Sequence, residues 1–336
     1  MNLVTGGTGL VGSYLLFDLT SRGEKVRALI RSGKDPSSVR RLFQSLDAHS
    51  EQYSLIEWAE GDITDPYSLL TALENVEMVY HCAAMISFEP RIRKEMMHVN
   101  IEGTANVVNA CLQKKVRKLC HVSSIASLGR PEQGGVIDEH ARWKTSRRNS
   151  GYAVSKYGSE REVWRGIEEG LNAVIVNPSV ILGVSDEQKA TSWLFHSIDK
   201  MVPFYTEGVN GYVDVRDVAK AMILLMDSQV SGERFILNSE NLSLYKLLSL
   251  AAEMLKKRPP FIPLGRPLLS IAWRLEWIRS RFTGNAPVIT RENVRSAQAK
   301  SYYSAEKFIR QFDYKFLPVR NSLEDALVMI GKIDGR

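Results

Sequence analysis

Short apolar runs alternate with helical repeats of apolar residues through the first half of the chain. The runs predict strands at Asn2–Thr5, Lys25–Ile30, Leu55–Trp58, Glu77–Cys82, Val116–Ser123 and Ala173–Val176. The repeats predict helices at Leu10–Ser21, from about Pro66, up to about Cys111 and at Tyr152–Glu168. Strands that alternate with helices form βαβ units with right-handed crossovers. The pattern therefore predicts an α/β fold, a doubly wound parallel sheet with helices on both faces.

The pattern becomes less regular after about Asn177. The second half has a helical repeat at Val218–Met226, a strand-like run at Arg234–Leu237, a Pro- and Gly-rich loop at Lys256–Pro267 and a Trp-bearing amphipathic segment at Leu268–Phe282. We predict a Rossmann-type domain from residues 1–177 and about 211–238. Residues of about 178–210 and 239–336 are expected to form a smaller, mostly helical substrate-binding domain.

Composition is that of an ordinary globular protein. Hydrophobic residues make up 44% of the chain and charged residues 24%, which excludes collagen-like, coiled-coil and disordered chains. The net charge of +6 suits anionic ligands such as phosphates. Acidic residues are interleaved with the basic ones almost everywhere, so no nucleic-acid partner is expected.

Cysteine spacing and hydropathy indicate the cellular compartment in which the protein is expected. Cys82, Cys111 and Cys120 show no CxxC spacing and no pairing with histidine, so we expect free thiols and no metal site. No apolar run approaches the roughly 20 residues of a membrane span, and the N-terminus lacks the features of a signal peptide. These patterns predict a soluble, cytoplasmic protein.

A glycine-rich turn follows the first predicted strand and leads directly into a helix. Its sequence is Thr5-Gly6-Gly7-Thr8-Gly9-Leu10-Val11-Gly12. Glycines in this position make a tight turn, admit a pyrophosphate to the backbone and let the helix pack on the strand. The helix N-terminus supplies free N–H groups for the phosphates. The turn predicts dinucleotide binding at Gly6, Thr8, Gly9, Leu10, Val11 and Gly12, and so an NAD(P)-binding first domain.

The end of the second predicted strand selects between the two dinucleotides. An acidic residue there would bind the ribose hydroxyls and disfavour a 2′-phosphate, but Arg31 occupies the position. Arg31 and Ser32 suit a 2′-phosphate, with Lys34 or Arg40 assisting. Stacking of Arg31 on adenine would serve either cofactor. We predict NADP as the preferred cofactor and NAD as the alternative.

Tyr152 and Lys156 lie at the start of a predicted helix and four residues apart, so they share one face. A nearby ammonium lowers the pKa of a phenol from its free value of about 10, which makes the phenol useful as an acid or base. Ser123 and Ser124 end the fifth predicted strand, and ligands gather at the carboxyl ends of strands in such a sheet. These residues predict a Ser-Tyr-Lys catalytic site.

These motifs resemble the extended short-chain dehydrogenase/reductases of the NAD-dependent epimerase/dehydratase superfamily, and most closely the dihydroflavonol-4-reductase-like proteins. Further matching segments are Gly61-Asp62-Ile63-Thr64-Asp65, Val79-Tyr80-His81-Cys82-Ala83-Ala84, Val99-Asn100-Ile101-Glu102-Gly103-Thr104, Asn177-Pro178-Ser179 and Tyr212–Ala219. Together they span residues 1 to about 228.

The resemblance implies a role for each matching residue. Ser124 would be the catalytic serine, with Ser123 as the alternative, and Tyr152 the acid/base. Lys156 would lower the pKa of Tyr152 and bind the nicotinamide ribose, and Asn100 would support this lysine and a proton-relay water. The remaining cofactor contacts would be Asp62 and Ile63 at adenine, Ala83 and Ala84 at the backbone approach, Ser123 at the strand end, and Pro178 and Ser179 near the nicotinamide.

Three activities fit these motifs: a carbonyl reductase or alcohol dehydrogenase, a nucleotide-sugar epimerase or dehydratase that retains its NAD, and a non-catalytic NAD(P)-sensing protein. The occupied Ser, Tyr and Lys positions disfavour the third. The serine strand end lacks the Thr-Asp-Glu of 4,6-dehydratases. Asn210 stands where the epimerases of this family usually carry an arginine that grips the diphosphate. We therefore expect reduction of a ketone or aldehyde, or oxidation of the matching alcohol, with a small-molecule substrate.

Other segments suggest further roles. The basic loop with Arg142, Lys144, Arg147 and Arg148 either captures an acidic substrate or is simply solvated. Aromatic residues that either line a substrate pocket or pack in the core are Trp193, Phe195, Phe204, Tyr205, Trp273 and Trp277. By resemblance alone, Arg91–Cys111 and Tyr152–Glu168 are candidate helices for a homodimer contact.

Overall fold

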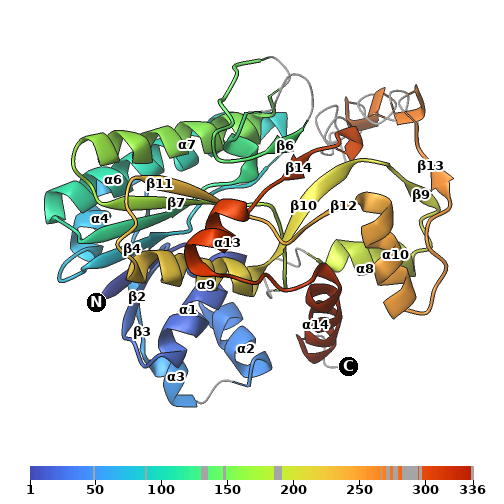
Figure 1. Cartoon of the computed structure of the whole chain (residues 1–336). Coiled ribbons are helices and arrows are strands. Elements are labelled where there is room, and N and C mark those ends of the chain that lie inside the picture. Colours follow the sequence, from blue (N-terminus) through green and yellow to red (C-terminus); the bar gives the residue numbers. More distant parts are fainter. Residues whose placement is uncertain are drawn as a thin grey trace.

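A computed structural model gives the fold of the chain (Figure 1). It describes residues 1–47, 50–87, 89–129, 135–146, 149–184, 191–265, 267–269, 273–274, 279–281, 294 and 297–333. The described part contains a seven-stranded sheet in the order β11-β7-β5-β4-β1-β2-β3, and each neighbouring pair is parallel. Its strands are β1 Asn2–Thr5, β2 Val26–Ile30, β3 Ile56–Glu60, β4 Met78–His81, β5 Lys118–Val122, β7 Ala173–Pro178 and β11 Glu233–Leu237. The predicted doubly wound α/β fold is confirmed.

Alternation of side chains along the strands creates a separate core on each face of the sheet. Val4 of β1 belongs to the core beneath α1 (Leu10–Ser21), α2 (Ser37–Ser45) and α9 (Val215–Asp227). The next residue back, Leu3, belongs to the core on the other face. That core lies beneath α4 (Pro66–Ala72), α6 (Gly103–Lys114) and α7 (Gly151–Glu168).

The strand order reverses direction at β1, because β2 lies on one side of it and β4 on the other. At such a point the loops after adjacent strands diverge toward opposite faces and leave a crevice at the carboxyl edge. The turn after β1 and the segment after β4 border this crevice. The topology therefore puts a binding site where the glycine-rich motif lies.

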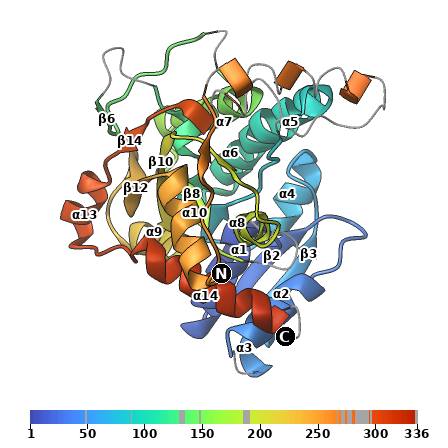
Figure 2. The same ribbon diagram turned by 90° about the vertical axis from the view of Figure 1, so that its right-hand side faces the viewer.

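The second part of the chain combines helices with a small sheet that the hydrophobic pattern does not predict (Figure 2). Its three strands are β8 Val180–Leu182, β10 Val209–Asp214 and β12 Glu240–Ser243, in the order β12-β10-β8. Helices α8 (Ser192–Asp199), α10 (Leu244–Met254) and α14 (Val319–Ile333) enclose a third core with them. The strands are short and alternate too briefly to stand out from loops.

The two parts are interleaved along the sequence. Helix α9 returns to the main sheet after β10, and β11 pairs with β7 at the sheet edge. Near the C-terminus, Phe308 of α13 (Glu306–Phe312) is packed in the core of the main sheet. Two-stranded pairs complete the description: β9 Phe204–Tyr205 with β13 Ile262–Pro263, and β6 Val136–Ile137 with β14 Tyr302–Tyr303. Strand β13 lies inside Lys256–Pro267, which we predicted as a loop.

The long helix predicted up to Cys111 is interrupted. Helix α5 (Arg93–Met97) passes into a π-helical turn at His98–Glu102 and then into α6, which ends at Lys114. Insertions of this kind are common at functional sites. Asn100 lies in the π-helical turn, with its side chain bonded outside the helix.

Three further findings concern the described residues. No helix among them is long and apolar enough to cross a membrane. They contain no group of His, Cys, Asp and Glu able to hold a metal ion. Cys82, Cys111 and Cys120 are free thiols, and the last two are buried.

Candidate active site

Two glycines of the glycine-rich turn cannot be replaced by residues with a side chain, because neighbouring backbone atoms lie too close to them. Gly6 has φ +69°, and a Cβ there would lie 2.7 Å from the backbone nitrogen of Ala83. A Cβ on Gly12 would collide with the carbonyl oxygen of Gly6. Gly9 begins α1 without a side-chain cap, so the first amides of the helix are left for a ligand. This cradle fits the pyrophosphate of a dinucleotide.

A cavity of about 1430 Å³ runs across the carboxyl edge of the sheet. It brings together almost all of the site residues predicted from the sequence. The lining includes Gly6, Thr8, Gly9, Leu10, Val11, Gly12, Arg31, Asp62, Ile63, Ala83, Ala84, Ser123, Ser124, Tyr152, Lys156, Pro178 and Ser179. Two predicted residues do not line it. Ser32 is exposed beside Arg31, and Asn100 is buried behind the wall.

One end of the cavity lies beyond β2 and is basic. Arg31 and Lys34, both exposed, line this end. Asp62 is half-buried at this end, and its Oδ1 accepts from the backbone amide of Thr64 at 2.8 Å. Arg40, the other candidate for a phosphate contact, instead lies over the ring of Tyr53 at 4.9 Å from its centroid and does not line the cavity.

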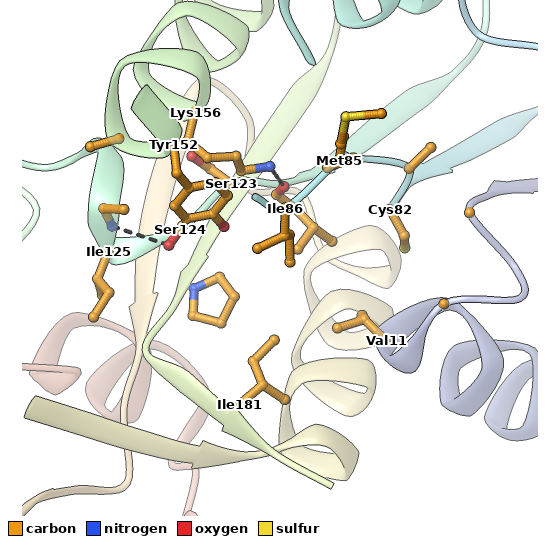
Figure 3. Close-up of a pocket in the computed structure, with 18 of the residues that line it drawn as sticks. Val11, Cys82, Met85, Ile86, Ser123, Ser124, Ile125, Tyr152, Lys156 and Ile181 are labelled. Atoms are coloured by element: carbon orange, nitrogen blue, oxygen red, sulfur yellow. Dashed lines mark hydrogen bonds between the residues drawn. The ribbon is translucent and has the colours of Figure 1, made fainter. Parts of the chain in front are cut away.

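Tyr152 and Lys156 lie in the first turns of α7, as the YxxxK spacing predicts. Ser150 caps this helix by accepting from the amide of Ala153 at 3.0 Å. Figure 3 shows both side chains on the wall of the cavity formed by α7 and the end of β5. Lys156 Nζ donates to the Val122 carbonyl at 2.7 Å.

The electrostatics of Tyr152 differ from the expectation drawn from the sequence. Lys156 is expected there to lower the pKa of Tyr152. In the structure burial raises the pKa of Tyr152, and the opposing influence is its hydrogen bond with Ser124. Burial also lowers the pKa of Lys156 to about 8, against the attraction of Glu160 and Cys82.

Geometry distinguishes the two candidate serines. Neighbouring residues of an extended chain point to opposite sides. Ser124 faces Tyr152, whose pKa its hydroxyl lowers, and its Oγ accepts from the Ala126 amide at 3.1 Å. Ser123 points to the interior and donates to Glu160 Oε2 at 2.6 Å. This arrangement favours Ser124 as the serine that meets a substrate.

Asn100 lies behind the cavity wall and joins two of the segments that form it. Its Nδ2 donates to the Met85 carbonyl and to Ser155 Oγ, both at 2.9 Å, and its Oδ1 accepts from the Met85 amide at 2.7 Å. The contact is therefore with the neighbour of Lys156 on α7. No hydrogen bond among the described residues joins the Asn100 side chain to Lys156 itself.

Predictions for the rim of the cavity are met in part. Trp143 and Lys144 of the basic loop line it, and Trp143 stacks on Tyr157 with centroids 4.4 Å apart. Arg147 and Arg148 lie outside the described residues, as do Trp277 and most of the segment around it. The other aromatic candidates, Trp193, Phe195, Phe204, Tyr205 and Trp273, do not line the cavity.

The sequence analysis missed several residues of the site. Apolar lining comes from Met85, Ile86, Ile125, Ile181 and Tyr303. Buried behind the lining is Glu160, which lies one helical turn after Lys156. A charged residue on the same face as a catalytic pair is a signal that could have identified it.

A comparison with protein families matches residues 2–238 to the NAD dependent epimerase/dehydratase family. The chain belongs to this family. It is an NAD(P)-dependent enzyme of the extended short-chain dehydrogenase/reductase type, as the sequence motifs predicted.

Relatives within the family are moderately similar. A Synechocystis sp. protein with the provisional name dihydroflavonol 4-reductase is 28% identical, over 96% of this chain and 92% of its own. Sterol demethylase protein B of Methylococcus capsulatus is 34% identical, over 75% of this chain and 74% of its own. The crystal structure of gox2253 has a TM-score of 0.81 and 31% identity, and covers 98% of this chain and 97% of its own.

Proposed function

We propose that this enzyme reduces an apolar ketone or aldehyde with NADP(H) as hydride donor, and oxidises the matching alcohol in reverse. The observation that carries the proposal is the apolar lining of the cavity beyond Tyr152. This lining is made of Met85, Ile86, Ile125, Val180, Ile181, Val209, Ala299 and Tyr303. Such a surface binds a hydrocarbon ring or chain far better than a charged group.

The described residues of the same region offer little positive charge to bind the diphosphate of a sugar nucleotide. Asn210 lines the cavity, and its Oδ1 accepts from the amide of Gly211 at 3.0 Å. An amide in this position offers no positive charge to a diphosphate. Among the described lining residues, Lys144 is the one cation outside the basic end beyond β2 and the Lys156 position. The reductase-type name of the Synechocystis relative also supports carbonyl reduction.

Each residue of the site has a separate role in the proposed reaction. The nicotinamide, when bound, supplies the hydride. Ser124 is suited to donate a hydrogen bond to the carbonyl oxygen and hold it beside Tyr152. Tyr152 gives its phenolic proton to that oxygen as negative charge develops there. Lys156 binds the ribose hydroxyls with its ammonium, and the turn from Gly6 to Gly12 holds the pyrophosphate.

Preference for NADP(H) rests on the basic end of the cavity. Arg31 and Lys34 border the region beyond β2, where the adenosine ribose of a dinucleotide bound at the turn would lie. A guanidinium and an ammonium suit the 2′-phosphate of NADP(H). NAD(H) would leave both without that partner.

The experiment is a substrate screen with matched arms. One arm offers aromatic and alicyclic ketones and aldehydes with NADPH or NADH, followed by nicotinamide absorbance. The other offers UDP- and dTDP-sugars with NAD and analyses the sugars. We expect NADPH consumption with an apolar carbonyl and no altered sugar. An epimerised or dehydrated sugar, with no carbonyl reduced, would overturn the proposal in favour of the epimerase/dehydratase alternative.

A further inference from the structure

Glu160 is a buried carboxylate directly behind the candidate catalytic residues. It lies on α7, one turn after Lys156, and is 2% exposed. Its Oε2 accepts from Ser123 Oγ at 2.6 Å, Ser127 Oγ at 2.6 Å and Asn177 Nδ2 at 2.8 Å. Each of these partners lies on a segment that also borders Ser124.

The other oxygen of Glu160 is equally occupied. Its Oε1 accepts from Arg234 Nη1 at 3.0 Å and from Trp164 Nε1 at 3.3 Å. Arg234 itself is anchored by donating to the carbonyls of Glu139 and Ala141, in the loop that leads toward the cavity rim. The carboxylate therefore joins α7, the end of β5, β7 and β11 at a single point.

The partners of Glu160 fix the backbone of Ser124 from both sides. Ser123 precedes it, and the hydroxyl of Ser127 lies 2.8 Å from the Ser124 carbonyl. Asn177 Nδ2 also donates to that carbonyl at 3.1 Å. With its backbone held in this way, the Ser124 side chain stays on the side of Tyr152, whose pKa its hydroxyl lowers, while its Oγ accepts from the Ala126 amide at 3.1 Å.

An ionised carboxylate suits this set of neighbours, because each of the five groups around Glu160 can donate to it. The Ser127 hydroxyl has one hydrogen, which can go either to Glu160 or to the Ser124 carbonyl. An amide at this position would turn an N–H toward either Arg234 or Asn177, donor against donor. Burial opposes ionisation, but the hydrogen bonds and the charge of Arg234 lower the pKa of Glu160 below its usual value. A buried charge with this many partners is stable only while all of them remain.

We infer that the Glu160–Arg234 pair is a positioning unit that holds the Ser123–Ser127 turn so that the Ser124 hydroxyl faces Tyr152 and the substrate carbonyl. This inference rests on the proposed function, since it assigns Glu160 a role in the same reaction. Glu160 touches neither substrate nor cofactor. It acts through Ser124, and through its charge on Lys156.

The charge of Glu160 offers a second, independent readout. The titratable groups that face Lys156 are Glu160 on α7, His81 and Cys82 at the end of β4, and His121 on β5. Glu160 favours the charged form of Lys156 against burial. Removing that charge therefore lowers the pKa of Lys156 further and moves the alkaline limb of the pH–rate profile to lower pH.

The test is a double-mutant cycle between Glu160 and Ser124 on a carbonyl that the wild type reduces. Ser124→Ala should lower kcat by about 10²–10³-fold, as the loss of one oxyanion donor does. We expect Glu160→Gln to lower kcat by roughly 10–10²-fold with little change in the Kd for NADPH, and to shift the alkaline limb downward. In the Ser124→Ala background, Glu160→Gln should have almost no further effect on kcat.

Controls separate positioning from general destabilisation. Glu162→Gln, on the same helix, removes an ion pair with Arg165 that lies away from the site and should leave kcat and the pH profile unchanged. Glu160→Asp keeps the charge and should retain the wild-type alkaline limb. An equal loss of kcat from Glu160→Gln with and without Ser124 would overturn the inference.

A wild-type enzyme that reduces no carbonyl would refute the proposed function and leave the role of Glu160 to a structural test. A crystal structure of Glu160→Gln should show the Ser124 hydroxyl displaced from hydrogen-bonding distance of Tyr152. An unchanged contact between these two side chains would overturn the inference whatever the reaction.

Discussion

The phenol of Tyr152 is protonated at neutral pH, because its ordinary pKa is about 10 and burial raises it further. The Ser124 hydroxyl opposes this rise. A protonated phenol beside an apolar pocket is ready to give a proton to a carbonyl oxygen. In the proposed mechanism Lys156, bonded to the Val122 carbonyl, binds the nicotinamide ribose rather than acidifying Tyr152.

Replacement of Tyr152 by Phe tests this assignment. The variant keeps the ring and its packing but loses the transferable proton. We expect turnover of the carbonyl substrate to fall by at least about 10²-fold, because acid–base catalysis typically contributes that much. The Kd for NADPH, measured by fluorescence titration, should remain close to the wild-type value. Near wild-type turnover would show that another group donates the proton.

Arg31 gives a second prediction at this scale. Arg31→Ala removes one charge from the basic end of the cavity. A charge-assisted hydrogen bond is worth about 1.5–3 kcal/mol, so the Kd for NADPH should rise roughly 10–10²-fold. The Kd for NADH should change little. Arg40→Ala, whose guanidinium lies over Tyr53, is the control and should alter neither affinity. Equal wild-type affinities for the two cofactors would contradict the predicted preference.

At the scale of elements, the site depends on how closely α1 follows β1. Gly12 lies within the first turn of α1, and its missing side chain lets the helix approach the Gly6 carbonyl. This approach aims the uncapped helix start at the crevice beside β4. The π-helical turn before α6 shapes the opposite wall of the cavity. It directs the Asn100 side chain away from the helix, where it bonds both to the segment that follows β4 and to α7.

Gly12→Ala tests the packing of α1 on β1. In an ordinary helix this change stabilises by about 1 kcal/mol. Here the new methyl group would collide with the Gly6 carbonyl, and overpacking typically costs about 1–3 kcal/mol. We expect a lower free energy of unfolding and a Kd for NADPH raised by about 10-fold or more. Ser21→Ala, at the exposed end of the same helix, should leave NADPH binding intact. A more stable Gly12→Ala variant would show that the turn tolerates the methyl group.

At the scale of the whole molecule, two histidines lie in the middle of the main sheet. His81 of β4 and His121 of β5 are adjacent in register, with ring centroids 5.1 Å apart. Burial lowers the pKa of His81 to about 3, and burial with the charge of Lys156 lowers that of His121 well below its usual value. Both rings are therefore neutral in the fold, and neither nitrogen of His121 has a hydrogen-bond partner among the described residues.

These histidines should make the fold sensitive to acid. Their folded-state pKa values lie below the unfolded value of about 6.5, so their contribution to stability is complete above that pH and is lost as pH falls below it. For His81, whose folded-state pKa is about 3, the loss of stability is up to about 1.4 kcal/mol per pH unit, or roughly 2 kcal/mol between pH 8 and pH 5. His121→Leu should make the loss of stability between these pH values smaller than in the wild type, as measured by urea unfolding at both pH values. The exposed His140→Gln should not change it. An identical loss in His121→Leu would refute the assignment.

The sequence by itself determined the main sheet and the cofactor cradle, because both follow from local pattern. Buried parallel strands such as Ala173–Val176 are apolar throughout, and the turn from Gly6 to Gly12 needs glycine wherever the backbone packs too closely for a side chain. The YxxxK spacing likewise fixed Tyr152 and Lys156 on one face of a helix, since helical geometry depends only on neighbours in the chain.

The tertiary structure decided what depends on contacts between distant segments. It distinguished Ser124 from Ser123 by the side of the chain that each faces, and it revealed Glu160 at the junction of α7, β5, β7 and β11. It also showed that Met85, Ile86 and Ile181 line the cavity, whereas the described aromatic candidates do not, because no local pattern records which loops meet across the crevice. The direction of the Tyr152 pKa shift also depended on the tertiary structure, since burial is a property of the assembled fold rather than of the YxxxK spacing.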